Sequence, residues 1–246
     1  PQGGGGNDKK TQDTMTALIT GASRGIGKAI ALELASLGYD LAMPGRDLTL
    51  LGKTAEEAEK RGVRTLCIEA DLADSTTCPM IVERAAAEFG GIDLLVNCAG
   101  LSAAGSFTEA SPELWDKVFA VNAKAPFFLS QAALPYLKKS VKPTVINISS
   151  VVGFKGYANQ SVYASSKHAL AGFTQVFAKE VQPFGIRVHL ISPGGVATEM
   201  VKQMRPDIKA DELIQPEEIA EIVRFILTRK GKGTIDEFYI RRFSGL

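Results

Sequence analysis

The chain has 246 residues, of which 45% are apolar, and its 28 lysines and arginines nearly balance its 27 acids. This length suffices for one substantial α/β domain of ordinary globular composition. No basic block predicts a nucleic-acid-binding face, and no run of about 18 uncharged apolar residues predicts a membrane span. The three cysteines, Cys67, Cys78 and Cys98, lack the spacing of a paired metal motif, so we expect buried structural thiols and no metal site.

The first 14 residues are glycine-rich, polar and aperiodic, and they lack the apolar core of a signal peptide. Three interpretations remain open: a disordered native leader, a sequence left over from cloning, or the end of a transit peptide. We expect residues 15–246 to form one domain. The predicted location is the cytoplasm, or an organelle lumen if residues 1–14 are the end of a transit peptide.

Short β-rich runs alternate with amphipathic helical patterns from residue 16 onward. The first helix is expected over Gly25–Leu37, Ser111–Pro112 is a helix start, and Pro216 opens the last helix. This alternation predicts a Rossmann-type, doubly wound α/β domain with helices on both faces of a seven-stranded, mostly parallel sheet. The predicted strands are Thr16–Thr20, Asp40–Met43, Arg64–Glu69, Leu94–Asn97, Thr144–Ser149, Arg187–Ser192 and Ile235–Ile240.

A glycine-rich turn, Gly21–Gly27, joins the first strand to the first helix. Glycine allows close backbone approach, and a helix N-terminus offers free N–H groups and partial positive charge to a pyrophosphate. The turn thus favours a dinucleotide site, although a tight turn without a ligand would look similar. Arg24 in the turn and Arg46 after the second strand favour a 2′-phosphate, hence NADP(H) over NAD(H). Asp47 could bind a ribose instead, but we interpret it as a helix cap.

Further polar and small residues follow later strands. Asp71 follows the third strand, and Asn97–Gly100 ends the fourth, where open α/β sheets bind ligands. Asn122 stands four residues before Pro126, which has no N–H to donate to the Asn122 carbonyl. We therefore expect a kink there and a free carbonyl that could hold a proton-relay water, although a plain proline kink is equally consistent.

Tyr163 and Lys167 stand four residues apart in a long helical pattern that reaches about Val181, so they share a helix face. A nearby ammonium, together with the positive nicotinamide of an oxidised cofactor, would lower the pKa of the phenol and make it a usable acid/base. Ser150 ends the fifth strand and could hydrogen-bond a substrate oxygen. Ser149 competes for that role, and strand periodicity does not choose between the two.

Together these residues resemble the short-chain dehydrogenase/reductase family over roughly residues 15–240. Thr20–Gly27 resembles its nucleotide loop, Asn97–Gly100 its Asn-Asn-Ala-Gly motif with Cys98 in second place, and Pro193–Thr198 its nicotinamide-binding segment. The resemblance implies a catalytic tetrad of Asn122, Ser150, Tyr163 and Lys167, and its spacing selects Ser150 over Ser149. It implies cofactor contacts from Gly21, Ser23, Arg24, Gly25, Ile26, Gly27, Arg46, Asp71, Leu72, Asn97, Ala99, Gly100, Tyr163, Lys167, Pro193, Gly194, Val196 and Thr198.

Within that family the chain is most similar to 3-oxoacyl-carrier-protein reductases and related carbonyl reductases. The resemblance implies an NADP(H)-dependent enzyme, a carbonyl or acyl-thioester substrate, a homodimer or homotetramer, and a short lid near residues 199–214. One departure is the segment Gly233–Arg242, because those reductases usually end with a Val-Asp-Gly-Gly sequence. Two alternatives stay open: an NAD-dependent alcohol or sugar dehydrogenase, and a non-catalytic regulatory protein that binds the cofactor.

Overall fold

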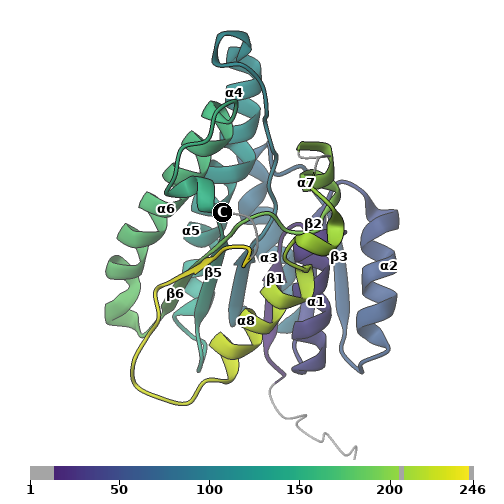
Figure 1. Ribbon diagram of the computed structural model, residues 1–246. Coiled ribbons are helices and arrows are strands. Elements are labelled where there is room, and N and C mark those ends of the chain that lie inside the picture. Colours follow the sequence, from purple (N-terminus) through teal and green to yellow (C-terminus); the bar gives the residue numbers. More distant parts are fainter. Residues whose placement is uncertain (1–13, 205–207, 244–246) are drawn as a thin grey trace, which may run out of the picture.

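The computed structural model describes residues 14–204 and 208–243, so the predicted leader lies almost entirely outside the described residues. Seven strands form one sheet in the order β3-β2-β1-β4-β5-β6-β7, and all six pairings are parallel. The predicted doubly wound sheet is confirmed (Figure 1). The strands are β1 Thr16–Ile19, β2 Asp40–Gly45, β3 Thr65–Glu69, β4 Leu94–Asn97, β5 Thr144–Ile148, β6 Arg187–Pro193 and β7 Glu237–Ile240.

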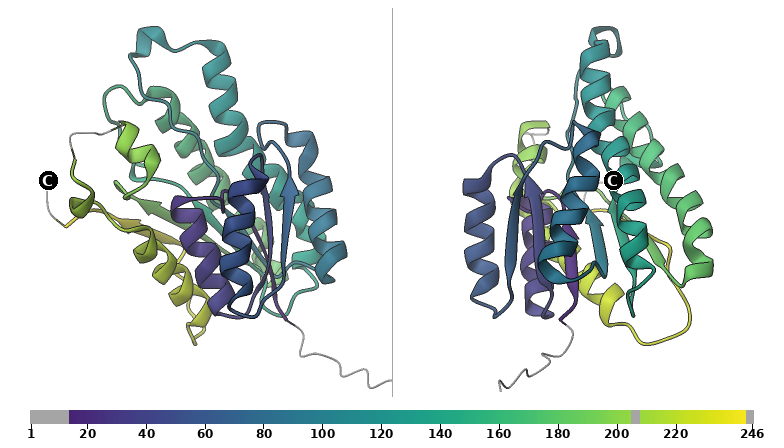
Figure 2. Two further views of the ribbon diagram at one scale, coloured as in Figure 1. Left: turned by 90° about the vertical axis from the view of Figure 1, so that its right-hand side faces the viewer. Right: turned by 180° about the vertical axis from the view of Figure 1, so that it is seen from behind.

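Helices cover both faces of the sheet (Figure 2). One core contains residues of α1, α2 and α8, and the other contains residues of α3, α5 and α6. Strand alternation sends Ala17 and Ile19 into the first core and Leu18 into the second. The α-helices are α1 Gly25–Ser36, α2 Leu48–Glu59, α3 Cys78–Phe89, α4 Pro112–Phe119, α5 Ala125–Leu137, α6 Ser161–Val181, α7 Glu199–Met204 and α8 Pro216–Thr228.

Strand β2 extends two residues beyond its predicted end and includes Pro44. A proline is rare in an inner strand because it cannot donate to the ladder. Here the register between β1 and β2 stops at Leu18 and Ala42, so Pro44 lies past the last β1 pairing. The extension carries Gly45 and Arg46 to the edge of the sheet where a ligand would bind.

The predicted helix caps are also found. The Ser111 hydroxyl accepts from the Leu114 N–H at 3.2 Å, and the Asp47 carboxylate accepts from the Leu50 N–H at 2.9 Å. Helix α6 begins two residues earlier than expected, at Ser161, which places Tyr163 within its first turn. In the region of the expected lid, the structure contains α7 and a short helical turn over residues 210–212. Residues 205–207 lie outside the described part.

Candidate active site

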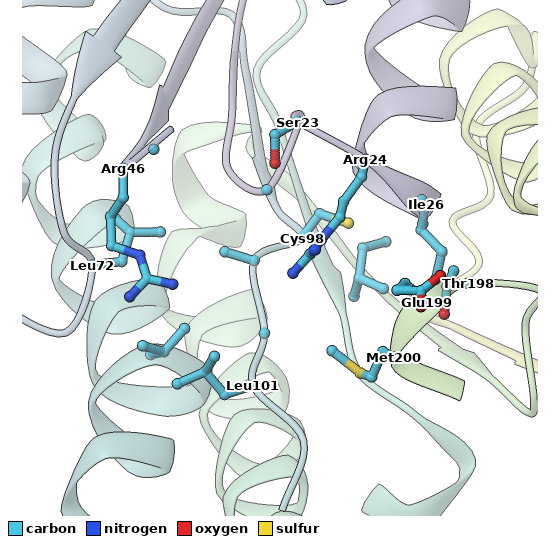
Figure 3. A pocket seen from close by; sticks show the side chains of 18 of the residues that line it. Ser23, Arg24, Ile26, Arg46, Leu72, Cys98, Leu101, Thr198, Glu199 and Met200 are labelled. Carbon is cyan, nitrogen blue, oxygen red and sulfur yellow. The ribbon is translucent and has the colours of Figure 1, made fainter. Parts of the chain in front are cut away.

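A cavity of about 410 Å³ opens at the carboxyl ends of the central strands (Figure 3). This is the edge at which doubly wound sheets bind ligands. Its wall contains twelve residues that the sequence analysis assigned to a cofactor: Gly21, Ser23, Arg24, Gly25, Ile26, Gly27, Arg46, Asp71, Leu72, Ala99, Gly100 and Thr198. Tyr163 and Lys167 line the same cavity. The fold therefore gathers most of the predicted residues into one space.

The glycine turn is closely packed against the loop after β4. Gly21 has a φ of +73°, and a Cβ there would lie 2.9 Å from the Cα of Ala99. A Cβ at Gly27 would lie 2.1 Å from the Gly21 carbonyl oxygen, which no backbone could accommodate. These positions keep side chains away from the start of α1, so its N–H groups stay accessible from the cavity.

Thr20 connects the glycine turn to the loop after β4, and both segments line this cavity. Its hydroxyl accepts hydrogen bonds from the N–H groups of Cys98 and Ala99, both at 3.0 Å. The same hydroxyl donates to the Val96 carbonyl at 3.5 Å. Sequence reasoning gave Thr20 no role of its own, because its role depends on a contact with a strand far along the chain.

Arg24 and Arg46 both extend their guanidinium groups into the cavity, from opposite sides (Figure 3). Asp47 does not line the cavity and caps α2, as predicted. The wall beside the end of β2 consists of Pro44, Gly45 and Arg46 and carries no acid. Asp71 is exposed, and its Oδ1 accepts from the Ala73 N–H at 2.9 Å.

The end of β5 and the first turns of α6 lie side by side and bring together Ser150, Tyr163 and Lys167. Lys167 Nζ donates to the Ile148 carbonyl at 3.0 Å and lies 5.9 Å from the centre of the Tyr163 ring. The Ser150 hydroxyl lies near enough to the Tyr163 phenol to lower its pKa and donates to the Pro193 carbonyl at 3.4 Å, whereas the Ser149 hydroxyl donates to the Lys167 carbonyl at 3.4 Å. Of the two serines, only Ser150 presents its hydroxyl to the tyrosine.

Burial determines the direction in which the pKa of Tyr163 shifts. Burial raises it to about 12, and the Ser150 hydrogen bond opposes that rise. Burial also lowers the pKa of Lys167 to about 8, an effect that Cys98 opposes. Among the protein's own groups, removal from water therefore dominates, and it shifts both pKa values toward the neutral forms. The predicted lowering of the phenol's pKa by the ammonium together with the oxidised nicotinamide concerns the protein with cofactor bound and stays a prediction.

Two predicted polar residues lie beneath the cavity and not on its wall. Asn97 is buried and donates to the Asn147 side chain at 2.8 Å. Asn122 is also fully buried, and its amide bonds the backbone of Leu101, which lines the cavity. In place of a simple proline kink, residues 120–124 form a π-helical turn between α4 and α5, with Asn122 at its centre.

A second cavity, of about 400 Å³, adjoins the first. Tyr163, Ser149, Ile26, Thr198 and Met200 line both cavities. The predicted cofactor residues Pro193, Gly194 and Val196, together with Ser150, line only the second. Tyr163 thus lies on the boundary between two spaces, each large enough for a small molecule or part of a cofactor.

Comparison with known proteins places this arrangement in a family. A family model described as short chain dehydrogenase matches residues 15–209. The chain belongs to the short-chain dehydrogenases. It is 32% identical to the 3-oxoacyl-[acyl-carrier-protein] reductase FabG of Staphylococcus aureus, with 89% of this chain and 93% of that protein covered.

Solved structures of other short-chain dehydrogenases are similar in shape. An alcohol dehydrogenase of Thermococcus sibiricus in complex with 5-hydroxy-NADP aligns with a TM-score of 0.87 at 29% identity, covering 94% of this chain and 98% of that one. A 3-oxoacyl-[acyl-carrier protein] reductase of Brucella melitensis in complex with NAD aligns with a TM-score of 0.81 at 28% identity, covering 87% and 89%. This short-chain dehydrogenase is accordingly an oxidoreductase that uses a nicotinamide cofactor.

Several residues that line the first cavity of this short-chain dehydrogenase were given no cofactor role from the sequence. Leu101 and Lys117 fall in no predicted motif, Cys98 lies within Asn97–Gly100, and Glu199 and Met200 lie in the predicted lid. The expectation that all three cysteines are buried was wrong for Cys98, which faces the cavity, and for the half-buried Cys67; only Cys78 is buried. Their side chains carry no sequence signal, because a cavity wall is assembled from many segments.

Two further observations concern absences within the described residues. No helix of residues 14–204 or 208–243 has the length and apolarity to cross a membrane. Over the same part of the chain, no group of three or more His, Cys, Asp or Glu residues is arranged to hold a metal ion.

Proposed function

We propose that this oxidoreductase transfers a hydride between NADP(H) and a carbonyl or hydroxyl substrate, with Tyr163 as the acid/base. The observation that carries the proposal is the position of Tyr163, which lines both cavities. A phenol at that boundary would reach the oxygen of a substrate in the second cavity, where that substrate faces a nicotinamide ring placed at the junction of the two cavities. All seven strands belong to one sheet, and helices pack on both of its faces. This arrangement supports residues 15–246 as a single catalytic domain.

The residues of the first cavity fit a dinucleotide. A Cβ at Gly21 or Gly27 would collide with backbone, so this part of the wall stays open to a pyrophosphate at the start of α1. When bound, the nicotinamide supplies or accepts the hydride. Lys167 would bind the nicotinamide ribose, and Pro193, Gly194, Val196 and Thr198 would hold the carboxamide end.

The remaining groups of the tetrad would act on the proton and the substrate oxygen. Tyr163, whose raised pKa keeps it protonated, would donate the hydroxyl proton during reduction. Ser150 would orient the carbonyl oxygen and stabilise its developing negative charge. Asn122 would hold a relay water at its main-chain carbonyl, while its side chain fixes the backbone of Leu101.

The preference for NADP(H) over NAD(H) is supported by charge. Arg24 and Arg46 both point into the cavity, and the end of β2 contributes no acid to its wall. Two guanidinium groups suit a 2′-phosphate, because each presents several donors in a planar fork. A carboxylate at that place would favour the unphosphorylated ribose.

The substrate is a carbonyl compound that fits a cavity of about 400 Å³, and the similarity to FabG makes 3-oxoacyl thioesters candidates. NADPH oxidation with acetoacetyl thioesters, diketones and quinones would identify it. A complete lack of turnover across the panel would favour a non-catalytic regulatory protein. A homodimer or homotetramer stays a prediction, and analytical sedimentation measures it.

Replacing Tyr163 with Phe tests the mechanism. We expect kcat to fall by about 100-fold or more, since general acid–base groups contribute that much, while NADPH affinity is retained. The matched control is Tyr136→Phe in α5, which removes a phenol that lines neither cavity. Turnover of the Tyr163→Phe protein at the rate of the unmodified protein would refute the mechanism.

A further inference from the structure

The second cavity carries concentrated positive charge. Lys155, Arg241 and Arg242 line it, and no Asp or Glu of the described chain does. Ser150 and Tyr163 line the same cavity. The lining of the space that would receive the reacting carbonyl therefore includes three residues with cationic side chains, of which Lys155 and Arg241 are also exposed to solvent.

The fold fixes the position of the two arginines. Strand β7 pairs with β6 up to Pro193 and Ile240, and the Gly194 N–H donates to the Ile240 carbonyl at 2.7 Å. A Cβ at Gly194 would lie 3.4 Å from that carbonyl oxygen, so the two backbones are in close contact. Arg241 and Arg242 follow the last paired residue directly. They belong to the segment Gly233–Arg242, in which the sequence departs from 3-oxoacyl-carrier-protein reductases.

The lysine comes from a distant part of the chain and is held beside the end of β7 by aromatic contacts. Lys155 Nζ lies 5.7 Å from the centre of the Tyr239 ring in β7. The Phe154 ring meets the same tyrosine edge-on, with centroids 6.4 Å apart. The loop after β5 and the end of β7 thus bring the three cations to one cavity.

None of the three cations has an acidic side chain as an ion-pair partner within the described residues. Like charges that share a cavity repel one another, and an oxyanion between them would relieve that repulsion. A guanidinium group binds carboxylate or phosphate in a bidentate manner. In addition, the buried Oε1 of Gln160, another lining residue, has no hydrogen-bond partner and could accept from a substrate hydroxyl or amide.

We propose that the substrate is a carbonyl compound that also carries a carboxylate or phosphate group, bound by Lys155, Arg241 and Arg242 while the carbonyl faces Ser150 and Tyr163. This inference rests on the proposed carbonyl reduction and specifies its substrate class. The three cations would act as specificity residues. They would position the substrate without taking part in proton or hydride transfer.

Paired substrates that differ only in charge test the proposal. We would compare 4-oxopentanoate with its methyl ester, and dihydroxyacetone phosphate with dihydroxyacetone, by NADPH oxidation. We expect kcat/KM to be at least tenfold higher for the anionic member of at least one pair, and the pair that shows this distinguishes carboxylate from phosphate. Raising the salt concentration should reduce the preference.

The variant Arg241→Gln/Arg242→Gln should lower kcat/KM for the preferred anion at least tenfold and change that for its neutral partner less than twofold. The matched control is Arg187→Gln/Lys230→Gln, which removes two exposed charges that line neither cavity. Sedimentation would verify that both variants keep the assembly of the unmodified protein. Equal activity on both members of each pair, or equal losses on both in the variant, would overturn the proposal.

A readout without turnover separates this inference from the proposed function. Isothermal titration would measure the binding of 4-oxopentanoate and of dihydroxyacetone phosphate to the NADP⁺-saturated protein. We expect the preferred anion to bind at least tenfold more weakly to the Arg241→Gln/Arg242→Gln variant. Reduction of neutral carbonyls without anion binding would reject the inference and keep the proposed function. Anion binding without any turnover would reject the proposed function and leave only an anion-binding site in the second cavity.

Discussion

Asn122 holds Leu101 by two backbone hydrogen bonds: the Leu101 N–H donates to Asn122 Oδ1 at 2.8 Å, and Asn122 Nδ2 donates to the Leu101 carbonyl at 2.9 Å. The same amide donates to the Ser166 hydroxyl at 3.0 Å. A buried side chain in the π-helical turn therefore fixes a loop that forms part of the cofactor cavity. The contact gives Asn122 a structural role beside the proposed role of its main-chain carbonyl.

Asn122→Ala should lower the free energy of unfolding by about 2–4 kcal/mol, because two partly buried backbone groups of Leu101 lose their partners. Urea denaturation monitored by circular dichroism measures the change. Asn122→Asp is a second variant that keeps the acceptor for the Leu101 N–H; it sets an oxygen against the Leu101 carbonyl and buries a carboxyl group, so we expect it to be destabilised as well. Equal stability of the Ala variant and the unmodified protein would contradict the role assigned to this side chain.

Thr20→Val should weaken NADPH binding about tenfold or more. The substitution keeps the shape of the side chain and leaves the N–H groups of Cys98 and Ala99 without their acceptor, so the floor of the cavity loosens. Fluorescence titration with NADPH measures the dissociation constant. Thr20→Ser retains the hydroxyl and should bind nearly as the unmodified protein does; a similar loss in both variants would assign the effect to packing instead.

Arg46→Gln should raise the KM for NADPH about tenfold or more and leave the KM for NADH nearly unchanged, because only NADPH offers a 2′-phosphate to the guanidinium. Arg24→Gln should act in the same direction. Steady-state kinetics with both cofactors measures the effect. A tighter affinity of the unmodified protein for NADH than for NADPH would overturn the proposed cofactor preference and support an NAD-dependent dehydrogenase.

The pH dependence should reveal the buried lysine. The pKa of Lys167 is lowered to about 8, and in the proposed role its ammonium form would donate to the cofactor ribose. We therefore expect kcat/KM for NADPH, which reports ionisations of the free protein, to be constant below that pH and to fall above it. Tyr163, with its pKa near 12, should add no titration in this range. A profile that stays flat up to pH 10 would contradict this assignment.

Loss of the folded state through deprotonation of Lys167 would not explain this fall in kcat/KM. Between pH 8 and about 10.5 the unfolded chain binds more protons at Lys167 than the folded protein does. The contribution of this group to the free energy of unfolding therefore increases as the pH rises through that window. Circular dichroism at each pH provides the check that the protein stays folded.

Gly27→Ala should abolish cofactor binding or folding, because its Cβ would lie 2.1 Å from a backbone oxygen. Gly52→Ala is a matched control on α2, where a Cβ meets no atom within 4 Å. That substitution should stabilise the protein by about 0.5–1 kcal/mol, since alanine is the better helix former. Thermal unfolding and NADPH titration of both variants test the pair, and a Gly27→Ala protein that binds NADPH normally would show that the turn does not form the proposed site.

Local pattern predicted much of the fold, since strand and helix periodicities and caps depend on near neighbours in sequence. Ser111 and Asp47 cap their helices as expected, because a capping side chain bonds an N–H only three residues away. Strand ends were less exact. The second strand was predicted to end at Met43, and only the register with β1 shows why Pro44 is tolerated in its extension.

The sequence by itself determined the alternation of strands and helices, the glycine turn at the start of α1, and the placement of Tyr163 and Lys167 on one helix face, because each follows from spacing along the chain. The tertiary structure alone decided that Thr20 and Asn122 hold the cavity loops, that Asn97 lies beneath the cavity, and that Arg241 and Arg242 line the second one. It also decided that burial raises the pKa of Tyr163. These properties depend on burial and on contacts between distant segments, which no local pattern encodes.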